Sequence, residues 1–306
     1  MAAVSPRDHH IPGAWRRCQA CTHSSLDFEP RMAKIARMPR PFRRWPLAIL
    51  TAALVIATAA LRPGAQAPNQ RPSRIQGKPN LSGLWQALNE ANWDIQAHEA
   101  RPGPPQFGAL FSEPAGTGVV DGNEIPYKPE ALDKKKQNFS NRWALDPETK
   151  CYMAGVPRAT YQPFPFQIVQ GTNTIVIAYP FASASRIVHL KDVGESPADS
   201  WMGWSRARWD GDTLVVTVTN LLEDTWFDRA GNFHSDALHV TERYTPAGDN
   251  VLQYEATIED PAVFTRPWTI RMPLYRRLEK NAQFLEFKCV PFAEELLYGH
   301  LRKPGS

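Results

Sequence analysis

Residues 225–240 read TWFDRAGNFHSDALHV and bring together three residue types that catalyse acyl transfer in serine hydrolases. His234, Ser235 and Asp236 are consecutive, however. Consecutive residues of a β-strand point to opposite faces of the sheet, so His234 and Ser235 cannot form a nucleophile–base pair with each other. The sequence also lacks the Gly-x-Ser-x-Gly turn that presents a nucleophilic serine in α/β-hydrolases. These residues therefore do not predict a serine hydrolase.

A second arrangement uses alternate residues of the same stretch. If residues 233–244 form a strand, its even positions share one face, and His234 and Glu242 lie on the same side. If that side lines a barrel, Trp226 and Asp228 reach into the same apolar interior from the preceding strand. Burial perturbs the pKa of a histidine or a carboxylate, which suits both to general acid–base catalysis. His234, Glu242 and Asp228 are therefore the candidate catalytic residues, although structural hydrogen-bonded groups would give the same pattern.

The segment 228–232 also fits ordinary turn chemistry. Gly231 can adopt a positive φ, and the Asp228 carboxylate can cap the turn by accepting backbone N–H groups. Asp228 thus has a structural interpretation beside the catalytic one.

Five residues are candidates for contact with a ligand. Arg158, Arg186 and Arg206 lie within or near predicted strands, and a guanidinium group pairs bidentately with a ligand carboxylate. Trp226 and Trp209 supply aromatic surfaces of the kind that line apolar pockets. Salt bridges and core packing are the structural alternatives for these side chains.

Metal and cofactor sites are not predicted. His189, His234 and His239 fall on different predicted strands or faces, and the spacings His-x-His and His-Glu-x-x-His are absent. Asp210 and Asp212 resemble part of a calcium loop whose other ligands are missing. A glycine-rich loop between a strand and a helix, which would bind a nucleotide, is also missing.

The charge of the chain depends on its first 67 residues. The whole sequence has a net charge of +4, whereas residues 68–306 carry 25 Lys and Arg against 28 Asp and Glu. The run at 134–136 fits a solvated helix face better than a binding patch. Nucleic acid is therefore not expected as a partner, because its binding needs a clustered positive surface.

Residues 32–67 have the pattern of a signal peptide. Basic residues precede an apolar run at 45–61, and Ala65-Gln66-Ala67 forms a small-x-small cleavage site. The apolar run is shorter than the roughly 20 residues that span a bilayer, although a retained anchor is the alternative. The protein is expected to be periplasmic or secreted, with membrane contact only through the signal segment.

Residues 1–31 precede this signal, which must be amino-terminal to be read. Translation is therefore expected to start at Met32 or Met38, and residues 1–31 are expected to be untranslated or disordered. Cys18 and Cys21 in this segment would make half a zinc site, and the partner pair is missing.

Two cysteines remain after cleavage, Cys151 and Cys289. In an oxidising periplasm they could form a disulfide that closes the domain, or they could be buried thiols. We slightly favour buried or loosely paired thiols on the sequence alone. A cysteine nucleophile is not indicated, since no histidine adjoins either residue.

The mature chain divides at Cys151. Residues 68–150 form an irregular extension with one short strand at 83–88 and a helix at 129–141 that begins with proline. Residues 151–292 are predicted to form a β-barrel domain, and 293–306 a C-terminal tail.

Short runs of β-branched and aromatic residues recur about every ten residues in the barrel domain, which is typical of an antiparallel sandwich or barrel. Asp210-Gly211 predicts a tight hairpin between two of these runs. The absence of helical patterns between the runs argues against parallel crossover folds. We predict a mainly β protein, an antiparallel up-and-down, lipocalin-like barrel with few short helices. The predicted strands are 167–170, 174–179, 185–190, 201–209, 213–221, 233–244, 251–258, 268–275 and 284–290.

A Gly-x-Trp in the first strand, Gly83 to Trp85, with a late arginine resembles the lipocalin arrangement in which Arg packs over Trp at one barrel end. Arg243 or Arg271 could supply that arginine. A longer set of motifs, CYMAGVPR from Cys151, WDGDTLVV, TWFD and HS, resembles a large group of exported bacterial proteins of unknown function. The resemblance covers roughly residues 80–292 and implies an exported, lipocalin-like β domain, without implying any reaction.

The sequence therefore predicts an exported barrel that binds an apolar or aromatic small molecule. A cofactor-independent lyase, isomerase or hydratase that uses acid–base chemistry is the first alternative. An envelope structural or assembly protein is the second.

Overall fold

The computed structural model describes residues 73–103, 105 and 112–290. The segment 1–31, the predicted signal peptide 32–67 and the predicted tail 293–306 lie outside the described residues. Cys18 and Cys21 lie outside them too.

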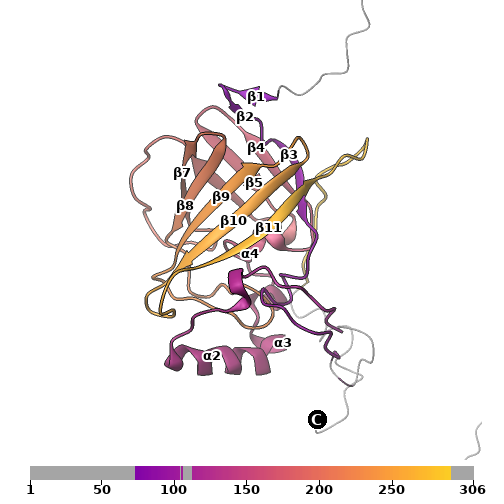
Figure 1. Ribbon diagram of the computed structural model, residues 1–306, viewed down its shortest axis with the longest axis vertical. Coiled ribbons are helices and arrows are strands. Elements are labelled where there is room, and N and C mark those ends of the chain that lie inside the picture. The colour runs from indigo at the N-terminus through magenta and orange to yellow at the C-terminus, as the bar shows by residue number, and fades with distance from the viewer. Residues whose placement is uncertain (1–72, 104, 106–111, 291–306) are drawn as a thin grey trace, which may run out of the picture. The chain divides into compact units, whose positions relative to one another are not determined.

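The chain folds into a closed β-barrel (Figure 1), so the predicted mainly β fold with a barrel and few short helices is confirmed. The nine strands follow the ring order β10-β11-β3-β4-β5-β6-β7-β8-β9. They are β3 (Gly83–Ala87), β4 (Phe166–Gln170), β5 (Thr174–Ala178), β6 (Ser185–His189), β7 (Trp204–Asp210), β8 (Thr213–Thr219), β9 (His239–Pro246), β10 (Val251–Glu259) and β11 (Trp268–Arg276).

One pair in this ring is parallel. Strand directions alternate around an antiparallel ring, so an odd number of strands cannot close without a parallel pair. Here β6 and β7 are parallel, and Val188 and His189 lie opposite Ser205 and Arg206. Between β6 and β7 the chain returns along the length of the barrel, so that β7 starts at the same end as β6. The ring is therefore mixed, and the predicted purely antiparallel, up-and-down arrangement is not confirmed.

The strand predicted at 284–290 is not formed, and residues 282–290 have no strand assignment. The ninth place in the ring is taken by β3, which pairs with β11 on one side and β4 on the other. A sheet closed in this way has no free edge for another strand. The barrel therefore includes part of the predicted extension 68–150.

The alternation of residues explains the orientation of the barrel strands. In β8, Leu214, Val216 and Val218 are buried, whereas Thr213, Thr217 and Thr219 are partly exposed, as predicted. The predicted hairpin joins β7 to β8, and Gly211 in its turn has a positive φ of 59°. Similar alternation in β9 and β10 buries one side chain in two.

Helices gather at one end of the barrel, where Figure 1 shows α2 and α3. The predicted helix at 129–141 is confirmed as α2 (Pro129–Ser140), with proline in its first turn. The other short helices are α3 (Arg142–Leu145), α4 (Arg158–Tyr161), η2 (Asp121–Asn123), η3 (Pro147–Lys150) and η4 (Phe181–Ser183). None of the helices in the described ranges is long and apolar enough to cross a membrane.

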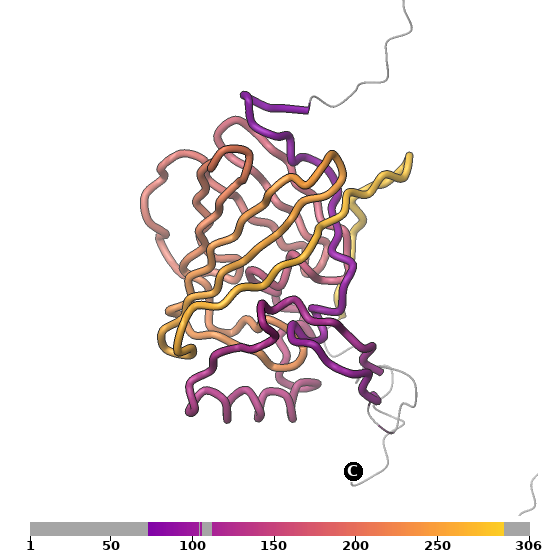
Figure 2. The backbone as a smooth tube through the Cα atoms, in the orientation of Figure 1, coloured from indigo at the N-terminus to yellow at the C-terminus, as the bar shows by residue number. Residues whose placement is uncertain are grey.

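A small hairpin lies at the opposite end, where the backbone trace begins its described course (Figure 2). It consists of β1 (Arg74–Ile75) and β2 (Lys78–Pro79), which form a two-stranded sheet of their own. We call the end that carries this hairpin the mouth and the end that carries α2 the helical end.

Cys151 and Cys289 are joined by a disulfide, which corrects the preference for buried thiols. The bond links residues 138 positions apart in the sequence. It holds the returning C-terminal segment against the barrel domain, where the Phe287 ring packs 4.7 Å from the ring of Phe164. Cross-linking such distant residues limits the conformations of the unfolded chain.

Removing the disulfide should lower the free energy of unfolding by about 2–5 kcal/mol. Cys151→Ser, Cys289→Ser and the double variant should lose nearly equal stability in urea titrations, because one bond is lost in each. The wild-type protein treated with a reductant should match them. Losses that add up in the double variant would contradict a shared bond.

Candidate functional site

The barrel interior contains a buried ion pair between Arg186 of β6 and Glu242 of β9. The two guanidinium Nη atoms donate to the two carboxylate oxygens at 2.6 and 2.9 Å. Both side chains are almost completely buried, at 1% and 0% exposure. A bidentate pair of this geometry satisfies both charges at once. Arg186, a predicted ligand-binding residue, is thus engaged by Glu242, a predicted catalytic residue.

Two tyrosines complete this interior cluster. The hydroxyl groups of Tyr244 and Tyr254 donate to Glu242 Oε1 at 2.9 and 2.8 Å. Burial raises the pKa of both tyrosines well above the usual value, and the Glu242 carboxylate raises it further. Burial alone would lower the pKa of Arg186, but Glu242 outweighs it and the pKa lies well above its usual value. The interior is therefore not apolar around Glu242, contrary to the prediction.

The barrel interior around this cluster is closely filled. Tyr244, Tyr254, Val216, Val240 and Ile258 have exposed fractions of 0%. A void large enough for water would leave accessible surface on the side chains that line it. These side chains therefore border no water-sized void, and the middle of the barrel offers no room for a ligand.

His234, the second predicted catalytic residue, lies just before β9 and is also buried. Its Nδ1 lies 2.8 Å from the carbonyl oxygen of Ser235, which can only accept, so Nδ1 carries the proton. Its Nε2 then accepts from the hydroxyl of Thr225 at 2.6 Å. Burial lowers the pKa of His234, partly offset by the Ser235 carbonyl. The pair resembles a nucleophile and its base, yet both residues are 1% exposed and unreachable for a substrate.

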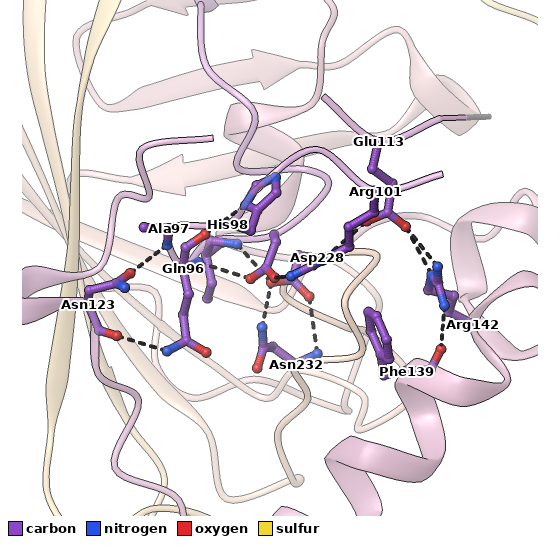
Figure 3. A network of polar contacts seen from close by, with 12 residues as sticks. Gln96, Ala97, His98, Arg101, Glu113, Asn123, Phe139, Arg142, Asp228 and Asn232 are labelled. Carbon is purple, nitrogen blue, oxygen red and sulfur yellow. Dashed lines mark hydrogen bonds and ion pairs between the residues drawn. The ribbon is translucent and has the colours of Figure 1, made fainter. Parts of the chain in front are cut away.

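Asp228, the third predicted catalytic residue, caps the turn as its structural interpretation predicted. The carboxylate accepts the backbone N–H groups of Ile95 and Asn232 and the side-chain amide of Asn232, at 3.0, 3.1 and 2.6 Å (Figure 3). Gly231 in this turn has the expected positive φ, 81°. Burial raises the pKa of Asp228 to about 7, with a further rise from the Asp94 carboxylate. The three predicted catalytic side chains therefore have separate hydrogen-bond partners.

Arg158 belongs to a network of buried charges at the helical end. It donates to Asp146 at 2.8 and 2.9 Å and to Glu148 at 2.6 Å. Arg229 donates to the same Glu148 at 2.8 Å. Burial would raise the pKa of Glu148, but Arg229 and Arg158 lower it to about 2. Arg158 therefore forms salt bridges within the protein, which was the structural alternative to its predicted contact with a ligand.

A neighbouring set of ion pairs joins the irregular extension to the helices (Figure 3). Glu113 accepts from Arg101 at 3.2 Å and from Arg142 at 2.9 Å. Arg101 also contacts Asp94 at 3.1 Å. These pairs fasten Asp94, Arg101 and Glu113 to the helical end, and they consume the charges that a ligand there would need.

The remaining predicted ligand residues lie apart from one another. Trp226 is 8% exposed and packs within the core. Arg206 lines a groove of about 240 Å³ on the barrel flank, together with Trp204 and His239. Trp209 lines a cleft of about 330 Å³ at the mouth.

A cleft of about 800 Å³ lies at the mouth. Leu81, Trp85 and Leu252 border it from beneath, but each is 1% exposed, so little of their surface faces the cleft. Polar and charged side chains form its outer part. The full lining, which we call the mouth cleft, is Ser73, Arg74, Pro79, Asn80, Leu81, Trp85, Asp212, Pro246, Gly248, Asp249, Asn250, Leu252 and Arg276.

Trp85 is fixed from two sides in the mouth cleft. Its indole Nε1 donates to the carbonyl oxygen of Leu81 at 2.8 Å. The guanidinium carbon of Arg276 lies 4.0 Å from its ring centroid, a cation–π distance. The arginine over Trp85 is thus Arg276, at the end of β11. Arg243 and Arg271, proposed from the sequence, instead pair with Asp210 and Asp121 on the outside.

Sequence reasoning missed the mouth cleft because its walls come from four separated segments. Only the Gly83-x-Trp85 motif pointed to this barrel end, through its resemblance to the packing of an arginine over a tryptophan in lipocalins. The described residues contain no group of three or more potential metal ligands among His, Cys, Asp and Glu.

No family model, curated protein or solved structure matches the chain. Function must therefore be argued from the geometry of the chain itself.

Replacing Glu242 by glutamine should lower the free energy of unfolding by about 3–5 kcal/mol, because Arg186 would keep a buried charge without a counter-ion. The double variant Arg186→Met, Glu242→Gln should recover part of the loss. Glu255→Gln is the control, because Glu255 pairs with Arg271 on the exposed face of the adjacent strand. A loss for Glu242→Gln as small as that of the control would contradict the role of the pair.

The raised pKa of Asp228 predicts a pH dependence of stability. The Asp228 carboxylate binds a proton more tightly in the native protein than in the unfolded chain. The stabilisation that this carboxyl group contributes is therefore fully present below about pH 3.9 and is lost as pH rises through about 7. Relative to Asp228→Asn, the wild-type free energy of unfolding should fall from pH 4 to pH 8, on the order of 1.4 kcal/mol per unit of pKa shift. The exposed Asp224→Asn should show no such trend. Parallel curves for wild type and Asp228→Asn would contradict the assignment.

Proposed function

We propose that this protein binds a small molecule with an apolar or aromatic body in the mouth cleft. The observation that carries the proposal is the cleft of about 800 Å³ with Trp85 at its base. Ligand pockets in proteins fall in the range of about 300–1,000 Å³ and combine apolar walls with a few polar groups. In the mouth cleft the amides lie at the rim, and the apolar side chains of Leu81, Leu252 and Trp85 lie directly beneath, where a ligand would reach them by displacing the Arg276 guanidinium that covers the Trp85 ring.

The charges in the cleft lining favour an uncharged ligand. Two arginines and two aspartates line it, so neither sign predominates. Arg74 and Asp212 neutralise each other at 2.6 Å. Arg276 donates to the backbone carbonyls of Ser82 and Asp249. A ligand ion would have to compete with these contacts, whereas a neutral molecule would need only the apolar base and hydrogen bonds from the rim.

The acid–base alternative has less support. His234, Glu242 and Asp228 are each at most 1% exposed, and each has its own partners. A substrate would have to open the core to reach any of them. The assembly-protein alternative predicts a solid barrel core and no enclosed site, and the closely filled interior agrees with it. The mouth cleft is the observation that favours binding over this alternative.

We also propose that the barrel is lipocalin-like and that the protein is exported. The packing of Arg276 over Trp85 supports the first proposal, because the Gly-x-Trp and late arginine resemble that arrangement. The Cys151–Cys289 disulfide supports the second, since such bonds persist in oxidising compartments. The odd strand number and the β6–β7 parallel pair would then be variations on an up-and-down barrel.

A cleft-filling substitution tests the proposed site. Asn250 is exposed in the turn after β9 and lines the mouth cleft, so Asn250→Trp should fill it without disturbing the core. Gln137→Trp on the exposed face of α2 is the control, because it adds the same ring at the helical end. The probe is N-phenyl-1-naphthylamine, a neutral aromatic molecule that fluoresces when desolvated. We expect its Kd to rise about tenfold in Asn250→Trp, equivalent to about 1.4 kcal/mol, and to stay unchanged in Gln137→Trp.

Native mass spectrometry of the periplasmic protein, before and after denaturation, complements this titration. A small molecule released from the wild type and missing from Asn250→Trp would support the proposal. Equal probe affinity in all three proteins, or equal retention of a released molecule, would overturn it.

A further inference from the structure

The β1–β2 hairpin is internally ordered. Its two-residue turn, Gln76 and Gly77, has positive φ values of 48° and 75°, as in the turn type that matches the twist of paired strands. Arg74 Nε also donates across the turn to the Gly77 carbonyl at 2.8 Å. Any movement of the hairpin would therefore carry β1, β2 and the turn between them together.

Its polar contacts with the barrel all reach one short turn. The Arg74 guanidinium donates to the Asp212 carboxylate at 2.6 and 3.2 Å. Lys78 Nζ donates to the Gly211 carbonyl at 3.0 Å. Gly211 and Asp212 are the two residues between β7 and β8. We call this set of contacts the latch.

The chain just after the hairpin is held firmly by the barrel. Leu81 is 1% exposed, its N–H donates to Gln170 Oε1 at 2.8 Å, and its carbonyl accepts from Trp85. A β-carbon added at Gly77, the tip of the hairpin, would meet no atom within 4 Å. The hairpin thus has a fixed base at Leu81 and open space at its tip, which places the pivot at Pro79–Asn80.

The hairpin also separates two clefts. Arg74 and Pro79 line the mouth cleft of about 800 Å³. Ile75, Gln76 and Lys78 line the second cleft of about 330 Å³, which contains Trp209. Each cleft has the hairpin as one wall, so the width of both depends on where the hairpin lies.

The latch is weak enough to open. The side chains of Arg74 and Asp212 are 48% and 58% exposed. Ion pairs this exposed contribute little to stability and weaken further as salt screens the charges. A closed hairpin held in this way opens often on the timescale of loop motion.

We propose that the β1–β2 hairpin is a lid over the ligand site, held closed by the latch, and that the two clefts become one site when it opens. This inference rests on the proposed binding of a small molecule at the mouth. The lid controls how fast the ligand enters and leaves, because the hairpin forms a wall of both clefts and is not itself one of the barrel strands.

The test compares Asp212→Asn with Asp210→Asn. Asp210 lies two residues away and forms an equally exposed ion pair with Arg243, at 3.2 Å, without touching the hairpin. We expect Asp212→Asn to speed hydrogen exchange of the hairpin amides and the association of N-phenyl-1-naphthylamine, each by up to about fivefold. High salt should bring the wild type close to Asp212→Asn. Asp210→Asn should match the wild type in both measurements.

The charge-swapped variant Arg74→Asp, Asp212→Arg rebuilds the latch and should restore slow exchange and slow association. Faster hairpin exchange without faster association would overturn the lid while leaving the binding site intact. Unchanged exchange in Asp212→Asn, or the same increase in Asp210→Asn, would overturn the latch. Absence of probe binding to every variant would overturn the proposed function and the lid with it, whatever the exchange rates.

Discussion

The closure of the nine-strand ring is the constraint on which the other features depend. Every barrel strand has a partner on both sides, so no edge remains, and the odd number of strands requires the parallel β6–β7 pair. Closure through β3 also brings the start of the described chain against β11. That contact sets Trp85 beneath Arg276 and so builds the base of the mouth cleft. The disulfide adds a covalent restraint on the segment that follows the last strand.

Polar groups are distributed unevenly along the barrel. The middle holds the Arg186–Glu242 pair, and the helical end holds Arg158, Glu148 and their partners. Buried charges must be paired, because an unpaired one costs several kcal/mol, and here each charge is matched by a buried counter-ion. The mouth is different, since its apolar base is flanked by a rim that water and other molecules can reach. The distribution itself therefore favours the mouth as the place of function.

The sequence predicted local features well and long-range ones poorly. The alternation in β8, the Asp-Gly hairpin, the proline-started α2 and the Asp228 turn follow from a few neighbouring residues, and all four are present. The segment 284–290 has the pattern of a strand, but β3 occupies the position in the ring between β11 and β4. No local pattern could reveal this, because the position depends on pairing between distant segments. The partner of each charge was equally hidden, because Arg186 and Glu242 are 56 residues apart. Burial of Glu242 followed from the alternation in β9, but the strand predicted over 233–244 begins only at His239, so the face predicted to be shared with His234 was wrong. The separate hydrogen-bond partners of the two residues depended on the whole fold.

The most direct test of ligand binding at the mouth is a crystal structure of the protein purified from the periplasm and then soaked with the neutral aromatic probe. The account predicts electron density for a small molecule against Trp85, between Leu252 and the β1–β2 hairpin, with the Arg186–Glu242 pair undisturbed. Density for the molecule in the middle of the barrel, with that pair broken, would contradict it. So would a probe bound only to the barrel flank beside Arg206.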